Sequence, residues 1–338
     1  MPPAPSPTYS FVIPFLDEAD NLAELHRRLS AVVTELDGEA EFIFVDDGST
    51  DGGRLRLLDL RRDDPRITVI CLSRNFGHQL AITAGVDVAR GDAVVIMDAD
   101  LQDPPEVVPE LAARWREGYE VVHAVRATRQ GEGRFKRATA HLFYRILNRA
   151  TDVDLPLDAG DFRLIDRRVA DIVRGMREPN RYLRGMFGWV GFQQTSVAYE
   201  RAERSAGETK FSLVKMLGFA ADGLISFSTV PLRIALSLGF LISALAFTVG
   251  IAAATIKVTG GFTIPGWASL AVLVSFFSGV QLVLMGAIGL YVGRTYEQGK
   301  GRPLYLISEI HGLDGTAGDD LHSRAVIVDS RWGQKQRS

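Results

Sequence analysis

Two long stretches without charged residues, near the C-terminal end of the chain, constrain the fold more than any other feature. Residues 234–256 and 268–293 contain no Asp, Glu, Lys or Arg. Each stretch exceeds the roughly 20 residues that a helix needs to cross a bilayer, and uncharged runs of this length are rare in soluble cores. We therefore expect a C-terminal hairpin of two transmembrane helices. The alternative is a pair of buried helices in a soluble domain.

The charges beside these stretches predict their orientation. The connecting residues 257–267 carry one lysine, whereas the outer flanks carry Arg233, Arg294, Lys300 and Arg302. The positive-inside rule then puts both chain termini in the cytoplasm. The sequence therefore predicts a multi-pass protein of the cytoplasmic (inner) membrane.

The remaining composition excludes some classes of protein. The chain has 338 residues and one cysteine, Cys71, so an internal disulfide is excluded. Its net charge of -3 gives no overall basic field for binding nucleic acid. Residues 1–8 lack the apolar core of a signal peptide and are expected to be disordered. Residues 294–338 are expected to form a cytoplasmic tail.

The first half of the chain alternates between strand-like and helix-like segments. Apolar runs typical of strands lie at 9–14, 42–45, 67–72, 92–97 and 119–125. Helical periodicity separates them, at 22–36, 54–62, 78–90 and about 104–117. Such alternation predicts an α/β fold with a mostly parallel sheet, covered by helices on both faces. Ligands of such sheets bind beyond the carboxyl ends of the strands.

Two acidic turns follow predicted strands. In the first, DADLQD (98–103), the side chains of Asp98, Asp100 and Gln102 would face the same way if strand geometry continued. Oxygen ligands of this kind suit Mg²⁺ or Mn²⁺. A second interpretation, compatible with the first, is a helix start with Asp103 as N-cap, Pro104 at N1 and Glu106 at N3.

The second acidic turn, DDGSTD (46–51), also ends a predicted strand. The carboxylates of Asp46 and Asp47 could accept hydrogen bonds from a nucleoside, or they could only cap a turn. Residues 210–228 mix basic and apolar residues at helical period. Because they lead into the first uncharged stretch, we expect an interfacial amphipathic helix over 210–230.

Seven motifs follow one another along the chain: VIPFLDEADNL (12–22), VDDGSTD (45–51), SRNFGHQLAITAGVDVARGD (73–92), MDADLQDPPE (97–106), RQGEGRFKR (129–137), GDFRLIDR (160–167) and ERAERSAGETKFS (200–212). Their order resembles the family 2 glycosyltransferases, which are inverting enzymes of the GT-A (Rossmann-like) fold. Within that family the chain looks most like the polyprenyl-phosphate glycosyltransferases, the group of bactoprenol glucosyltransferases and dolichyl-phosphate mannose synthases. The resemblance implies a GT-A catalytic domain over residues 9–209.

The resemblance also implies roles for individual residues. Those matching the nucleotide-sugar site are Pro14, Leu16, Glu18, Asp47, Asp98 and Lys210. Those matching the Mg²⁺ or Mn²⁺ site are Asp98, Asp100 and Gln102. Those matching catalytic positions are Asp161, as a base or an orienting group, and Arg201 and Arg204, in the loop over the diphosphate and the acceptor. Those near the lipid phosphate are Arg126, Arg129 and Arg137.

The implied reaction is the inverting transfer of one sugar, with UDP-glucose as the expected donor, to undecaprenyl or another polyprenyl phosphate at the membrane. A phosphate monoester has a second pKa of about 6, so the acceptor is largely ionised and needs little general base. This weakens a strict base role for Asp161, whose alternative role is to fix Arg163 or a neighbouring loop. His78 is expected to be structural.

Several alternatives remain open at this point. The sugar could be mannose, GlcNAc or a formamido-arabinose. The chain could also be a non-catalytic membrane scaffold that retains a nucleotide-binding fold. A homo-oligomer is left open, and no nucleic-acid partner is expected.

Overall fold

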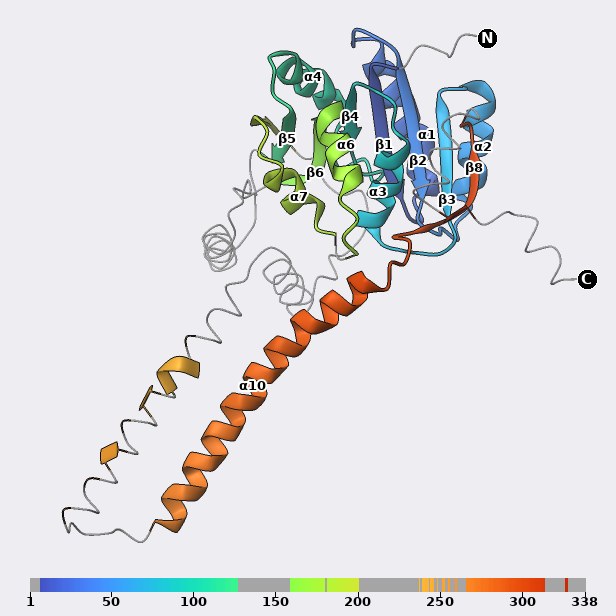
Figure 1. The fold of residues 1–338 in the computed structure, drawn as a ribbon. Helices are drawn as coiled ribbons and strands as arrows, with labels where there is room; N and C mark the ends of the chain where they lie inside the picture. The colour runs from blue at the N-terminus through green and yellow to red at the C-terminus, as the bar shows by residue number, and fades with distance from the viewer. Residues whose placement is uncertain are drawn as a thin grey trace, which may run out of the picture. The chain divides into compact units, whose positions relative to one another are not determined.

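The computed structural model describes residues 7–126, 159–179, 181–200, 266–313 and 326–327, together with single positions between 237 and 259. The chain forms two compact units (Figure 1). The first comprises residues 1–148, 152–212 and 302–338, and the second comprises 149–151 and 213–301. Each unit is considered by itself below.

The first unit is built on a sheet that has nine strands among the described residues, in the order β7-β5-β6-β4-β1-β2-β3-β8-β9. The strands are β1 (Tyr9–Phe15), β2 (Ala40–Asp46), β3 (Ile67–Leu72), β4 (Ala93–Ile96), β5 (Val121–Arg126), β6 (Ala159–Asp166), β7 (Gln194–Tyr199), β8 (Leu306–His311) and β9 (Val326–Ile327). Five of the neighbouring pairs are parallel: β1 with β2 and with β4, β2 with β3, β5 with β7, and β8 with β9. The predicted mostly parallel sheet is confirmed.

Helices cover both faces of this sheet (Figure 1). They are α1 (Ala19–Val33), α2 (Gly53–Asp63), α3 (His78–Val88), the 3-10 turn η1 (Pro105–Val107), α4 (Val108–Arg116), α6 (Arg167–Gly175) and α7 (Leu183–Trp189). Leu22, Leu25 and Leu29 of α1 recur at helical spacing and are fully buried in the main core with the aromatic side chains of β1 and β2. These strands are buried along their whole length, as expected for parallel strands covered on both faces.

Helix α3 packs closely against the sheet at Gly85. A Cβ atom there would lie 2.3 Å from Val12 Cγ1 and 3.2 Å from Val45 Cγ2. Only glycine therefore allows the helix to approach β1 and β2 this closely. The close approach fixes the height of α3 over the sheet, and so fixes where its first residue, His78, stands at the carboxyl edge.

Strand β6 runs antiparallel between β4 and β5. Its register pairs Ile96 of β4 with Arg163 of β6. Continued by two residues, the same register brings Asp98 opposite Asp161. The first residues of β6 therefore lie at the edge of the sheet where β4 ends.

The loop after β4 differs from the local prediction for Asp103. The helical segment begins at Pro105, with Pro104 preceding it and without a side-chain cap, so the prediction that Asp103 is the N-cap is wrong. The carboxylate of Asp103 is instead buried and accepts a hydrogen bond from the hydroxyl of Tyr199 at 2.5 Å. Strand geometry also stops before this point, because Leu101 has a φ of 59°.

The second unit contains the apolar helix α10 (Trp267–Gly299). Within it, Phe276–Gly299 is long enough to cross a membrane, and its most apolar 18-residue window has a mean hydropathy of 1.7 and no buried residues. It is the one such helix among the described residues. The expected two-helix hairpin is not confirmed, since most of residues 234–256 lie outside the part of the chain that the structure describes.

Candidate active site

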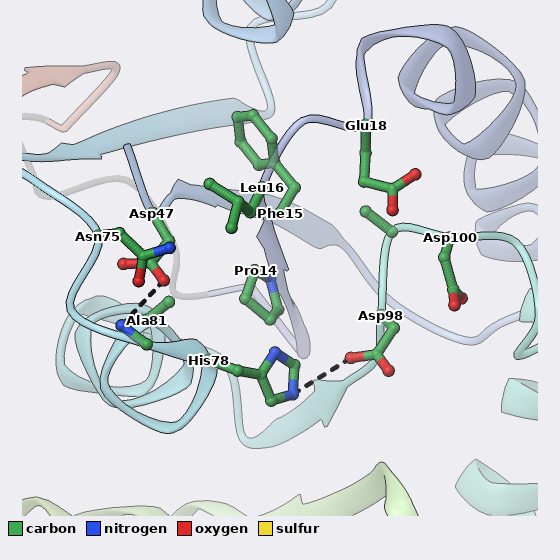
Figure 2. A pocket seen from close by; sticks show the side chains of 12 residues that line it. Pro14, Phe15, Leu16, Glu18, Asp47, Asn75, His78, Ala81, Asp98 and Asp100 are labelled. Carbon is green, nitrogen blue, oxygen red and sulfur yellow. Dashed lines mark hydrogen bonds and ion pairs between the residues drawn. The ribbon is translucent and has the colours of Figure 1, made fainter. Parts of the chain in front are cut away.

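A cavity of about 290 Å³ opens at the carboxyl edge of the sheet (Figure 2). It is lined by Pro14, Phe15, Leu16, Glu18, Asp47, Asn75, Gly77, His78, Ala81, Asp98, Ala99 and Asp100. These residues come from the ends of β1, β2 and β4 and from the start of α3. Figure 2 shows Glu18, Asp98 and Asp100 together on one side of the cavity and Asp47 and Asn75 on the other. One side is therefore rich in carboxylates.

Reciprocal hydrogen bonds join the two loops at the rim of the cavity. The backbone amide of Asp17 donates to Ser49 Oγ at 3.0 Å, and that of Thr50 donates to Asp17 Oδ1 at 2.7 Å. The backbone amide of Ala19 donates to Asp51 Oδ2 at 2.7 Å. The acidic turn of 46–51 thus holds the loop after β1 in place, in addition to any contact with a ligand.

Asp47 organises the segment that leads into α3. Its Oδ1 accepts from the amide of Phe76 at 2.7 Å and its Oδ2 from the amide of Gly77 at 2.9 Å. Burial raises the pKa of Asp47, and the two amide bonds oppose this rise. Gly77 has a φ of 101°, which favours glycine at this turn. Asp47 lines the cavity as expected, while its role toward a nucleoside stays a prediction.

His78 stands between two carboxylates. Its Nε2 lies 3.4 Å from Asp98 Oδ1 and 3.2 Å from Asp161 Oδ2. Apart from this contact with His78, Asp98 Oδ1 is buried and has no hydrogen-bond partner in the part of the chain that the structure describes. Burial raises the pKa of Asp98 to about 6, although the nearby His78 opposes the rise. Burial alone would lower the pKa of His78, but Asp161 and Asp98 outweigh it and raise that pKa.

Asp161 is held by several donors. Arg184 binds it at two points, with Nε 2.9 Å from Oδ1 and Nη2 3.2 Å from Oδ2, and Gln79 Nε2 lies 3.4 Å from Oδ2. Burial would raise the pKa of Asp161, but His78 and Arg184 hold it well below its usual range. A carboxylate with so low a pKa is a poor proton acceptor. The geometry favours an orienting group over a base.

Arg163, the expected partner of Asp161, is the more distant of its two arginines. Arg163 Nη2 lies 3.7 Å from Asp161 Oδ1, and the side chain is 1% exposed. Its Nε donates to the backbone carbonyl of Asp161 at 3.2 Å, and burial lowers its pKa to about 10. The closer partners, Arg184 and His78, were not predicted from the sequence. Arg184 lies in no recognised motif, and His78 was expected to be structural.

Part of the predicted metal site fits a hard cation. Asp98 and Asp100 both line the cavity, and the buried Asp98 Oδ1, which accepts no hydrogen bond from the described residues, suits a divalent ion that completes its shell with water and substrate oxygens. Gln102 is 5% exposed and does not line the cavity; its backbone amide donates to Asp100 Oδ1 at 3.1 Å. In the described part of the chain, no three or more His, Cys, Asp or Glu side chains form a ready-made metal cluster.

The other predicted site residues divide into three groups. Pro14, Leu16 and Glu18 line the cavity together with Asp47 and Asp98. Arg126 ends β5, next to Tyr199 of β7, and is not among the residues lining the cavity. The others lie outside the described residues: Arg129, Arg137, Arg201, Arg204 and Lys210.

Known proteins resemble this chain over most of its length. The glycosyl transferase family 2 model matches residues 10–173. The uncharacterised glycosyltransferase YkcC of Bacillus subtilis is 46% identical, over 90% of this chain and 95% of that protein. A prophage bactoprenol glucosyl transferase homologue of Escherichia coli is 37% identical, over 89% and 98%.

Among solved structures, the mannosyl-3-phosphoglycerate synthase of Rubrobacter xylanophilus is 17% identical, with a TM-score of 0.48 over 68% of this chain and 75% of that one. The two sequence relatives assign the family, because they are 46% and 37% identical to this chain over nearly their whole length. The chain is a glycosyltransferase and belongs to glycosyl transferase family 2.

Proposed function

We propose that this enzyme transfers glucose from UDP-glucose to a polyprenyl phosphate, with inversion, at the cytoplasmic face of the inner membrane. The observation that carries the proposal is the cavity at the carboxyl edge of the sheet, where Asp98 and His78 line the wall and His78 also contacts Asp161. Relatives named bactoprenol glucosyl transferase, such as that of Shigella phage SfII, are 37% identical over 98% of their length. Their names support glucose as the sugar and a polyprenyl phosphate as the acceptor.

On the donor side, Asp98 and Asp100 in the carboxylate-rich half of the cavity would hold Mg²⁺ or Mn²⁺ close to the diphosphate. Gln102, which does not line the cavity, stays only a prediction as a ligand. A bound divalent ion neutralises the charge that develops on the departing diphosphate. Asp47 and the loop after β1, with Pro14, Leu16 and Glu18, hold the nucleoside and sugar.

On the acceptor side, the reaction needs orientation more than proton transfer. An oxygen of the lipid phosphate attacks the anomeric carbon, the bond from that carbon to the diphosphate oxygen breaks, and the nucleoside diphosphate leaves. The attacking oxygen of an ionised phosphate carries no proton to be removed. The low pKa of Asp161 agrees with an orienting role. Basic side chains bring the two anions together: Arg126, Arg129, Arg137, Arg201, Arg204 and Lys210.

The topology of the sheet supports a membrane hairpin. Strand β7 ends at Tyr199 and β8 begins at Leu306, and both belong to the same sheet. The chain between them therefore begins and ends on the same side of any membrane, so it crosses an even number of times. If Phe276–Gly299 is one crossing, the uncharged run 234–256 supplies the other.

A donor panel tests the reaction directly. The purified full-length protein in detergent is given undecaprenyl phosphate, Mn²⁺ or Mg²⁺, and radiolabelled UDP-glucose, UDP-GlcNAc or GDP-mannose. We expect label in the lipid extract with UDP-glucose, and its loss in Asp100→Ala. The control is Asp59→Ala, at an exposed carboxylate on α2. If no donor labels the lipid, the proposed function is wrong and the scaffold alternative gains support.

A further inference from the structure

Two strands that end side by side lead into the segments expected to bind the acceptor. In the parallel ladder of β5 and β7, Arg126 is paired with Tyr199. Along the sequence, Arg129 and Arg137 follow the first strand, and Arg201 and Arg204 follow the second. Arg126 and Tyr199 are therefore the last pair of the ladder, directly before the two segments that contain these arginines.

The hydroxyl of Tyr199 joins this pair to the acidic loop. It donates to Asp103 Oδ1 at 2.5 Å, the short distance typical of a bond to a charged acceptor. The guanidinium of Arg126, its neighbour in the ladder, lies beside the hydroxyl and opposes the rise of the Tyr199 pKa that burial causes. Tyr199 and Asp103 are 5% and 2% exposed, so the phenol between the guanidinium and the carboxylate is buried.

The acidic loop is thereby fixed at both ends. At one end Asp98 and Asp100 line the cavity, and at the other Asp103 is bound to Tyr199. Between them, Leu101 turns the chain in the left-handed region and the amide of Gln102 donates to Asp100. A shift of Tyr199 would therefore be transmitted to the donor side through only a few residues.

Arg126 has a feature that suits an anion. Its Nε is buried and has no hydrogen-bond partner among the described residues. Buried donors are nearly always satisfied in folded proteins, and a phosphate oxygen is a strong acceptor for a guanidinium. The hydroxyl of Tyr199, which is paired with Arg126 in the ladder, lies against the same guanidinium.

We propose that Tyr199 is a positioning residue for the acceptor: it holds Arg126 ready for the lipid phosphate and keeps it in fixed register with the acidic loop that serves the donor. This inference rests on the proposed function, because it takes a lipid phosphate as the ligand of Arg126. Tyr199 matches no motif of the sequence and is not among the residues that line the cavity.

The test is Tyr199→Phe in the full-length enzyme. This change removes the hydroxyl but keeps the ring, which packs edge-on against Phe162 with the ring centres 5.8 Å apart. We expect the KM for undecaprenyl phosphate to rise about tenfold, as for the loss of one hydrogen bond to a charged group. The KM for UDP-glucose should stay within about twofold, because the donor side keeps its own contacts.

Tyr9→Phe is the matched control. Like Tyr199, Tyr9 is a buried tyrosine beside an arginine: its side chain is fully buried, and its hydroxyl accepts a hydrogen bond from Arg116 Nη2 at 2.6 Å. It begins β1 and so lies at the opposite edge of the sheet from the cavity. Both variants should show a similar drop in Tm, but only Tyr199→Phe should change the KM for the acceptor. Equal KM values in the two variants would overturn the inference.

A double-mutant cycle with Arg126→Lys tests whether Tyr199 affects acceptor binding through Arg126. If Tyr199 acts through Arg126, adding Tyr199→Phe to Arg126→Lys should raise the acceptor KM by less than twofold further. Fully additive effects, or an equal rise in both KM values, would contradict the proposal.

Calorimetric binding of farnesyl phosphate to the wild type and to Tyr199→Phe distinguishes a failure of the positioning role from a failure of the proposed reaction. Weaker binding to the variant supports the positioning role even if the wild type transfers no sugar, in which case only the reaction is wrong. Equal binding to both proteins counts against the positioning role itself.

Discussion

Asp161 and Arg184 form a two-point ion pair, in which the guanidinium Nε and Nη2 lie 2.9 and 3.2 Å from the two carboxylate oxygens. The pair connects β6 to α7 and fixes the plane of the carboxylate beside His78. Since the pKa of Asp161 is held well below its usual range, this carboxylate remains charged at every pH at which the enzyme is expected to work.

The first prediction concerns Arg184. Arg184→Ala should lower kcat by roughly 10- to 100-fold, because Asp161 loses its two-point contact with Arg184 and keeps only the longer contacts with Gln79 and His78. Arg184→Lys should recover only part of this loss, since an ammonium group cannot make the same two-point contact. Initial rates with saturating substrates provide the measurement. Arg62→Ala, at a surface arginine of α2, should have wild-type rates; a wild-type rate for Arg184→Ala would show that the ion pair is dispensable.

The second prediction is the pH dependence of stability at Asp161. A carboxylate whose pKa is lower in the folded than in the unfolded protein contributes stability above its unfolded pKa of about 3.9 and loses it as the pH falls through the folded value. Asp161→Asn should therefore have a lower Tm than the wild type from pH 5 to 8. The difference should shrink below about pH 4. Thermal unfolding followed by fluorescence tests this, and a difference that grows on acidification would contradict the low pKa.

The third prediction links metal affinity to Asp98. Because burial raises the pKa of Asp98 to about 6, a proton competes with the cation below that pH. Mn²⁺ affinity should be nearly constant above pH 7 and should fall roughly tenfold per unit well below pH 6, as for one ligand that must lose a proton. Titration with Mn²⁺, followed by electron paramagnetic resonance, measures this.

Asp98→Asn provides the companion measurement. This variant should bind Mn²⁺ weakly at every pH and should lose the dependence, because its amide does not titrate in this range. An unchanged affinity in Asp98→Asn would remove this residue from the metal site.

The fourth prediction concerns the segment that follows the apolar helix. Tyr305 is 1% exposed, and its hydroxyl donates to Asp87 Oδ2 of α3 at 2.6 Å, where Arg177 Nη1 also binds at 2.7 Å. Tyr305→Phe should lower the free energy of unfolding by about 1–3 kcal/mol, because a buried carboxylate loses a donor. Chemical denaturation measures the change. Leu55→Ala, at a side chain that is 61% exposed, should leave stability within about 0.5 kcal/mol.

The sequence predicted the elements whose signals are local. The segments that form β1 to β5 have strand composition and are separated by segments of helical period. Their order along the chain and the mostly parallel sheet could therefore be predicted from the sequence. The acidic turns were also located correctly at the carboxyl edge, since strand ends can be read from the sequence. Asp47, Asp98 and Asp100 line the cavity for this reason.

The features that the sequence missed depend on contacts between distant segments. Asp103 has the local features of an N-cap, but Tyr199, far along the chain, takes its carboxylate. His78 appeared structural because no local pattern brings Asp161 beside it; only the antiparallel insertion of β6 does so. Strand β8 falls in what the sequence suggested was a tail, because its pairing with β3 cannot be read from residues 306–311 alone.

The place of β8 in the sheet has a consequence for biosynthesis. It pairs with β3, yet it comes after α10 in the chain. Until the ribosome has delivered residues 306–311, β3 presents an open edge that can pair with other nascent chains. The sheet is thus completed only after the apolar helix has been translated. Pairing of β8 with β3 is therefore a late step of folding, which follows the synthesis and membrane insertion of that helix.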